Sequence, residues 1–235
     1  MNYTYKDIIE SYTDDKRLSD KNSHFILYHI YRPLSFPVTW LFLKLKFSAN
    51  SITLITILIS VALPFLLISE TVKLKFVAGV LMFFYLLLDC VDGNVARVTN
   101  TTKKVGLFFD AFSGLLFWGL VFPFVGIGAS ENNIYFKEII YLLPHFGFYI
   151  VILFFMARLL SQQCKAMSVN FEEDDNQPSS SIYLFLKSFF DLIPILYLVA
   201  LYSLAVDIFL SLFLMYSLSV LIYIIYNSYH ILKNE

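Results

Sequence analysis

The chain is poor in charged residues and in cysteine. Only 15% of its 235 residues are charged, whereas 58% are apolar and the mean hydropathy is +0.70. A soluble domain of this length could not bury so much apolar surface. Cys90 and Cys164 lie in or beside apolar segments and offer neither a disulfide framework nor zinc-ligand spacing, so we expect no redox role for them. A net charge of −1 also argues against nucleic acid as a partner.

Long apolar runs account for most of the chain. A helix needs about 20 apolar residues to cross a bilayer. The sequence predicts an all-α integral membrane fold with six transmembrane helices, over residues 52–68, 76–98, 105–128, 136–160, 182–205 and 207–229. We expect residues 1–47 to form a cytoplasmic N-terminal segment with an interfacial amphipathic helix, and residues 48–235 to form one six-helix membrane domain.

The positive charges are unevenly distributed between the two sides of the predicted domain. Besides the N-terminal segment, they concentrate in the connections between spans two and three and between spans four and five, at Arg97, Lys103, Lys104, Arg158, Lys165 and Lys187. The opposite loops contain only Lys73, Lys75 and Lys137. Because lysine and arginine near span ends favour the cytoplasm, we expect both termini on the cytoplasmic side of the cytoplasmic membrane.

Three aspartates lie in or at the ends of spans two and three. A lone carboxylate at the bilayer centre costs about 3 kcal/mol, so Asp89, Asp92 and Asp110 need compensation. Asp89 and Asp92 share one helix face, and Asp110 lies between Gly106 and Gly114 on another. If these faces turn inward, three hard oxygen donors surround one cavity. That cluster suits Mg²⁺ or Mn²⁺, as one ion or as a two-metal site that bridges to phosphate.

Other interpretations of these aspartates remain open. A single aspartate could form a plain salt bridge with Arg97, Lys103 or Lys104. The three carboxylates could also coordinate a passing cation in an ion transporter.

The order and spacing of these residues point to one protein family more specifically than their chemistry does. Asp89, Asp92, Gly93, Ala96, Arg97, Gly106 and Asp110 resemble the signature of the CDP-alcohol phosphatidyltransferase family, D-x2-D-G-x2-A-R-x8-G-x3-D-x3-D. Ala49-Asn50-Ser51 before span one, which we expect to cap that helix, is similar to the asparagine-containing segment of the family. The resemblance covers most of the chain, although only residues 89–110 are specific.

The resemblance implies an enzyme of phospholipid or related glycoconjugate synthesis, facing the cytoplasm and working as a homodimer in the membrane. It transfers a substituted phosphoryl group from a CDP-linked donor, either CDP-diacylglycerol or a CDP-alcohol, to an acceptor, and CMP is released. By resemblance, Asp89, Asp92 and Asp110 bind the metal, and Asp110 is catalytic. The residues that would bind the nucleotide are Asp89, Gly93, Ala96, Arg97 and Gly106.

The sequence departs from the signature at its fourth aspartate, which is the family's proposed general base. Gly114 stands there and cannot take a proton. The protein could be a catalytically impaired relative that binds CDP-linked ligands or partners. Alternatively His145, Asp191 or a metal-bound water could supply the base. A third possibility is an anionic acceptor that needs no base, with Gly114 enlarging its pocket and Arg158 or Lys187 holding its charge.

Overall fold

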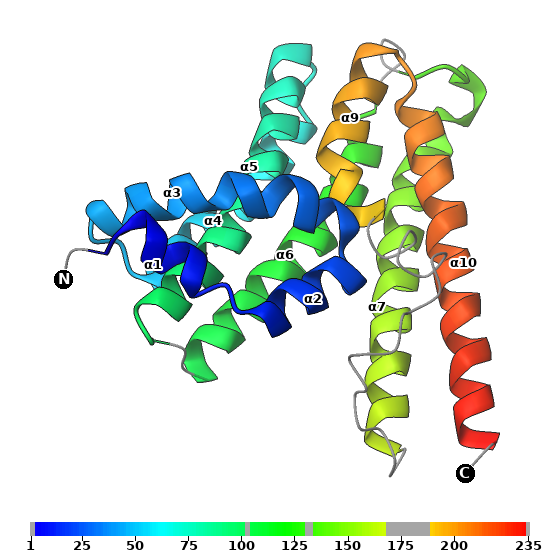
Figure 1. Ribbon diagram of the computed structural model, residues 1–235. Helices are drawn as coiled ribbons and strands as arrows, with labels where there is room; N and C mark the ends of the chain where they lie inside the picture. The colour runs from blue at the N-terminus through cyan, green and yellow to red at the C-terminus, as the bar shows by residue number, and fades with distance from the viewer. Residues whose placement is uncertain (1–2, 102–103, 130–133, 168–188, 234–235) are drawn as a thin grey trace.

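The computed structural model describes residues 3–101, 104–129, 134–167 and 189–233, and these residues form helices without a strand (Figure 1). Helices long and apolar enough to cross a membrane cover Ala49–Leu67, Val72–Val98, Lys104–Ile127, Lys137–Gln163 and Val206–Tyr226. A further apolar helix, Phe190–Tyr202, is shorter. The first part of the predicted fifth span, residues 182–188, lies outside the described residues. The all-helical membrane fold is confirmed with five such helices, and the count of six spans stays a prediction.

The N-terminal segment forms helices that pack on the membrane domain. They are α1 (Tyr5–Glu10), α2 (Asp14–Ser23), the π-turn η1 (Leu27–Tyr31) and α3 (Arg32–Lys44). Thr4 and Thr13 cap α1 and α2 with their hydroxyls. Helix α3 packs on α5 and lies across the direction of the long helices α7 and α10 (Figure 1). This orientation agrees with a helix that follows the membrane surface, which stays a prediction.

Three helices carry the aspartate signature: α4 (Ala49–Leu67), α5 (Val72–Val98) and α6 (Lys104–Ile127). Helix α4 packs against both of the others. Its cap lies one residue earlier than the sequence predicts, because the Ser48 hydroxyl accepts a hydrogen bond of 3.2 Å from the Ser51 N–H. The start of α4, the end of α5 and the start of α6 therefore meet at one end of the domain.

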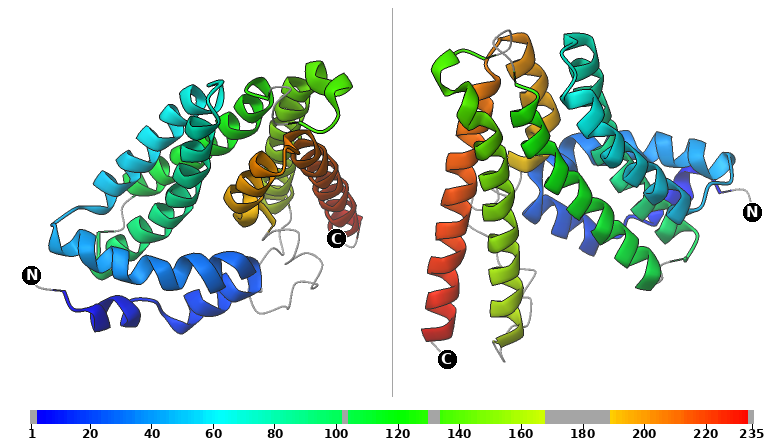
Figure 2. Two further views of the ribbon diagram at one scale, coloured as in Figure 1. Left: turned by 90° about the horizontal axis from the view of Figure 1, so that it is seen from above. Right: turned by 180° about the vertical axis from the view of Figure 1, so that it is seen from behind.

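The remaining helices complete the bundle. They are η2 (Lys137–Leu142), α7 (Leu143–Met167), η3 (Phe190–Leu192), α9 (Ile193–Tyr202) and α10 (Val206–Lys233). Helices α7 and α10 run side by side (Figure 2). Helix α7 also approaches α6 closely, since a Cβ on Gly126 would collide with the Leu143 carbonyl.

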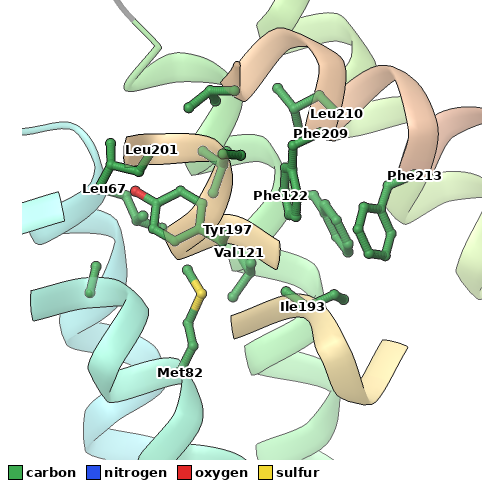
Figure 3. Packing of buried hydrophobic residues seen from close by; sticks show 14 of the residues in the cluster. Leu67, Met82, Val121, Phe122, Ile193, Tyr197, Leu201, Phe209, Leu210 and Phe213 are labelled. Carbon is green, nitrogen blue, oxygen red and sulfur yellow. The ribbon is translucent and has the colours of Figure 1, made fainter. Parts of the chain in front are cut away.

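The main hydrophobic core occupies the other end of the domain. Its side chains come from the second half of α4, the first half of α5, the second half of α6, the start of α7, and from α9 and α10, and Figure 3 shows part of this cluster. Tyr85 stacks on Phe117 at the boundary, with ring centroids 3.8 Å apart. The Tyr85 hydroxyl lies 3.2 Å from the Ser113 hydroxyl, which lies 2.9 Å from that of Thr56. This polar layer separates the aromatic core from the aspartate end.

Candidate functional site

A cavity of about 70 Å³ opens where α4, α5 and α6 meet. Its walls are mostly small and polar side chains, and they come from the signature and from the start of α4: Ala49, Asn50, Thr53, Asp92, Gly93, Ala96, Thr101, Gly106, Leu107 and Asp110. We call it the signature cavity. Five of the seven matching signature positions line it, so the fold brings together residues that are spread over two helices.

The three aspartates differ in their surroundings. Asp92 is buried, and its Oδ2 accepts a hydrogen bond of 2.7 Å from the Thr53 hydroxyl. Asp110 is exposed on the cavity wall. Asp89 is partly exposed and does not line the cavity. In the described part of the chain, no lysine or arginine forms a salt bridge with any of them.

The donor set fits a divalent cation in its chemistry. Carboxylate oxygens are the ligands that Mg²⁺ and Mn²⁺ prefer, and a cation would relieve the repulsion between Asp89 and Asp110. The residues that the structure describes nevertheless contain no group of three or more His, Cys, Asp or Glu side chains around one metal position. The shared metal site therefore stays a prediction.

Arg97 folds back over its own helix beside the signature cavity. Its Nη2 donates a hydrogen bond of 2.6 Å to the Asn94 side-chain oxygen. A Cβ on Gly93 would lie 3.5 Å from Nη1, which is ordinary van der Waals contact, so the guanidinium packs directly over this glycine. The buried Nε of Arg97 has no hydrogen-bond partner. Because an unpaired buried donor is costly, this N–H is available to an anionic ligand such as a phosphate.

A buried polar network behind Arg97 ties α5 to the N-terminal helices. Arg32 donates from Nη1 to the Asn94 side-chain oxygen (3.3 Å) and from Nε to Asp20 (2.7 Å). Burial raises the pKa of the Asp20 carboxyl, but Arg32 and Lys16 outweigh it and hold that pKa below its ordinary value of 3.8. A charged Asp20 therefore keeps Arg32 against Asn94, and Asn94 in turn orients Arg97.

The sequence interpretation did not include this network. Asn94 occupies a variable position of the signature, and Asp20 and Arg32 lie far from it along the chain. Asn94 itself indicates such a network, because it lies in an apolar helix and a buried amide needs hydrogen-bond partners. Its partners could not be identified from the sequence.

The two glycines of α6 have different surroundings. A Cβ on Gly106 would lie 3.3 Å from the Asn50 side-chain oxygen, so glycine allows α4 and α6 to approach closely. A Cβ on Gly114 would meet no atom within 4 Å. The space beside Gly114 is therefore open, and a larger side chain would fit there.

A second and larger cavity of about 430 Å³ lies among α6, η3, α7 and α10. Its walls are rich in aromatic side chains and include a few polar groups: His24, Trp118, Phe154, Ala157, Arg158, Ser161, Gln162, Phe190, Asp191, Tyr216, Val220, Tyr223 and Ile224. We call it the aromatic cavity. Arg158, predicted to hold the acceptor, is exposed on its wall, whereas Lys187 lies outside the described residues.

The predicted substitutes for the missing base occupy different places. His145 is near the start of α7, where its Nδ1 lies 3.2 Å from the Tyr141 carbonyl oxygen. Arg158 follows 13 positions later, which is about 20 Å along a helix, so His145 is distant from the aromatic cavity. Asp191 is buried in that cavity's wall beside His24, a residue that the sequence interpretation did not consider for this role.

The comparisons with known proteins agree with this geometry. No curated protein matches the chain significantly. The family model described as CDP-alcohol phosphatidyltransferase matches residues 46–225, which include α4, α5, α6 and both cavities apart from His24. Enzymes of this family generally depend on a divalent metal. Because the match covers well over half of its length, the chain belongs to the CDP-alcohol phosphatidyltransferase family.

Proposed function

We propose that the protein is an active CDP-alcohol phosphotransferase of phospholipid or related glycoconjugate synthesis. It transfers a substituted phosphoryl group from a CDP-linked donor to an acceptor and releases CMP. The observation that carries the proposal is the signature cavity, where Asp92, Gly93 and Asp110 meet in a chain of this family. Its small side chains leave room for a ligand, and its carboxylates have no lysine or arginine in a salt bridge with them among the described residues.

The signature cavity binds the nucleotide end of the donor. Gly93, Ala96 and Gly106 leave space for it, and the unpaired Nε of Arg97 donates a hydrogen bond to a phosphate oxygen. Asp89, Asp92 and Asp110 would hold Mg²⁺ or Mn²⁺, which supplies charge neutralisation for the pyrophosphate and for the leaving CMP. Asp110 is the most exposed of the three aspartates, so we place it nearest to the reacting phosphorus.

The aromatic cavity binds the acceptor. It is about six times larger than the signature cavity, and its apolar walls suit a lipid-like or ring-shaped molecule. Arg158 would pair with an anionic group of that molecule, whether a lipid headgroup or a free phosphate. The lysines and arginines near the signature end favour a cytoplasmic site, and family membership favours a homodimer.

The alternative is a relative that binds CDP compounds without turnover, which the absence of a carboxylate at position 114 favours. The deciding experiment measures CMP release by the purified protein in lipid with Mg²⁺ or Mn²⁺. Donors are CDP-diacylglycerol and soluble CDP-alcohols, each with hydroxyl and phosphorylated acceptors. We expect CMP release that requires one acceptor and is lost in Asp110→Asn. CDP compounds that raise the melting temperature without CMP release would instead establish the binding protein, and a cation transporter would show neither effect.

A further inference from the structure

The open question in the proposed function is which group removes the proton of a hydroxyl acceptor. We propose that His24 is this base and that Asp191 positions it, so that the pair replaces the carboxylate missing at position 114. The inference rests on the proposed function and deepens it. Three observations carry it: a row of α6 residues that the two cavities share, a contact between His24 and Asp191, and the packing of that pair against α5 near the signature.

The first observation is that one face of α6 joins the two cavities. Gly106, Asp110, Gly114 and Trp118 are four residues apart and therefore lie along one face. Gly106 and Asp110 line the signature cavity, and Trp118 lines the aromatic cavity. Gly114 lies between them, with open space where its side chain would be. A group in the aromatic cavity can thus serve the space that a carboxylate at position 114 would occupy.

The second observation is the contact between His24 and Asp191. His24 Nδ1 lies 3.4 Å from Asp191 Oδ2, and both atoms are buried without a hydrogen-bond partner. The Asp191 side chain is 9% exposed and that of His24 is 34% exposed. The aromatic cavity also presents Arg158, Tyr216 and Tyr223, but these are cationic or phenolic. His24 and Asp191 therefore supply the imidazole and the carboxylate of this wall, the two kinds of side chain that most often act as general bases.

The third observation places this pair near the signature aspartates. The Tyr31 hydroxyl donates a hydrogen bond of 3.0 Å to the Asp191 carbonyl oxygen. Tyr31 is fully buried and clusters with Leu87 and Cys90 of α5, and Cys90 directly follows Asp89. Tyr31 therefore connects the His24–Asp191 pair to the part of α5 that carries the signature.

The proton transfer follows from this geometry. Because Nδ1 faces Asp191, Nε2 is the nitrogen that can accept a proton. As the acceptor oxygen forms its bond to the phosphorus of the donor's alcohol phosphate, its proton passes to His24 Nε2. The bond between that phosphorus and the bridging oxygen breaks, and CMP leaves with the electron pair. Asp191 stabilises the imidazolium, which releases the proton to solvent through the exposed part of His24.

The experiment compares kcat for CMP release with a hydroxyl acceptor in wild type, His24→Asn, His24→Ala and Asp191→Asn. A positioned base contributes about 10²- to 10⁴-fold, so we expect His24→Asn to lower kcat by at least about 100-fold without weakening CDP binding. Asp191→Asn should lower kcat less and alter the acidic limb of its pH profile. His29→Asn is the matched control, because His29 is exposed in the same segment and does not line the cavity.

Rescue separates a base from a merely structural histidine. Added imidazole should raise kcat for CMP release by His24→Ala. Adding Gly114→Asp to the His24→Asn variant should also raise kcat, because it returns a carboxylate to the open space. The inference is overturned if His24→Asn keeps the wild-type kcat, or if neither rescue raises the activity of the histidine variants. A wild type that releases no CMP overturns the proposed function and this inference together, whereas an active wild type with an indifferent His24 overturns only the inference.

Discussion

Residues of α6 line both cavities, but the cavities differ in size and in the side chains that form their walls. The signature cavity is small, and its walls combine carboxylates with glycine and alanine. The aromatic cavity is several times larger, and indole, phenyl and phenol rings form much of its wall. In the first, charge must be balanced when a ligand binds, so the residue type at each position is constrained. In the aromatic cavity, an apolar ligand needs only a wall of matching shape, and many combinations of side chains could form such a wall.

This difference predicts two kinds of mutational effect. Changes in the signature cavity should lower kcat, because its groups stabilise charge that develops during transfer. Changes in the aromatic cavity should mainly raise the KM of the acceptor, apart from those at the proposed base.

The largest effect is expected at the signature aspartates. Asp89→Asn, Asp92→Asn and Asp110→Asn keep the side-chain shape but remove charge from the predicted metal ligands. Each should lower kcat for CMP release by at least about 100-fold, as the loss of one electrostatic stabiliser does in other enzymes. The measurement is turnover as a function of Mg²⁺ and Mn²⁺ concentration.

Asp207→Asn is the matched control for these three variants. Asp207 is also buried, but its carboxylate accepts backbone hydrogen bonds of 2.9 Å from Tyr135 and 2.7 Å from Phe136 at the other end of the domain. Its replacement should cost about 1.5–3 kcal/mol of stability and leave kcat of the folded protein unchanged. Equal losses of kcat in all four variants would contradict a special role for the signature end.

The next effect is expected for Arg97→Lys. Lysine keeps the positive charge but lacks the planar guanidinium that bonds Asn94 and presents Nε. Hydrogen bonds to charged groups are worth about 1.5–3 kcal/mol, so kcat/KM for the donor should fall by about 10- to 100-fold. The KM of the acceptor should stay constant. A variant that changes only the acceptor KM would show that Arg97 serves the other cavity.

The signature end could be predicted from the sequence because its chemistry is concentrated on two adjacent helices. Within each helix, the helical repeat shows which residues share a face with Asp92 or with Asp110. The apolar residues on either side identify the two helices as membrane spans. The aromatic cavity combines His24 with residues about 95 to 200 positions later. No periodicity connects such distant segments, so neither this cavity nor the contact between His24 and Asp191 could be predicted.

A smaller effect is expected for Thr53→Val, which preserves side-chain volume and removes the hydrogen bond to Asp92. Groups that orient metal ligands typically contribute 10- to 100-fold to metal affinity. The Mg²⁺ concentration for half-maximal activity should therefore rise about 10-fold, while kcat at saturating Mg²⁺ changes little. Thr56→Val is the control, since Thr56 lies one turn further along α4 and contacts Ser113. The same Mg²⁺ shift in both variants would assign the effect to packing.

The smallest effect is expected for Arg158→Gln in the aromatic cavity. Arg158 is exposed on the wall, so solvent weakens any ion pair that it forms. Its loss should raise the KM of a phosphorylated acceptor by about 3- to 10-fold, equivalent to about 1 kcal/mol, and leave both kcat and the donor KM unchanged. A neutral hydroxyl acceptor should be unaffected, which tests charge recognition directly. If Arg158→Gln instead lowers kcat for every acceptor, the aromatic cavity takes part in the chemical step beyond the proposed base, and the division between charge in one cavity and shape in the other fails.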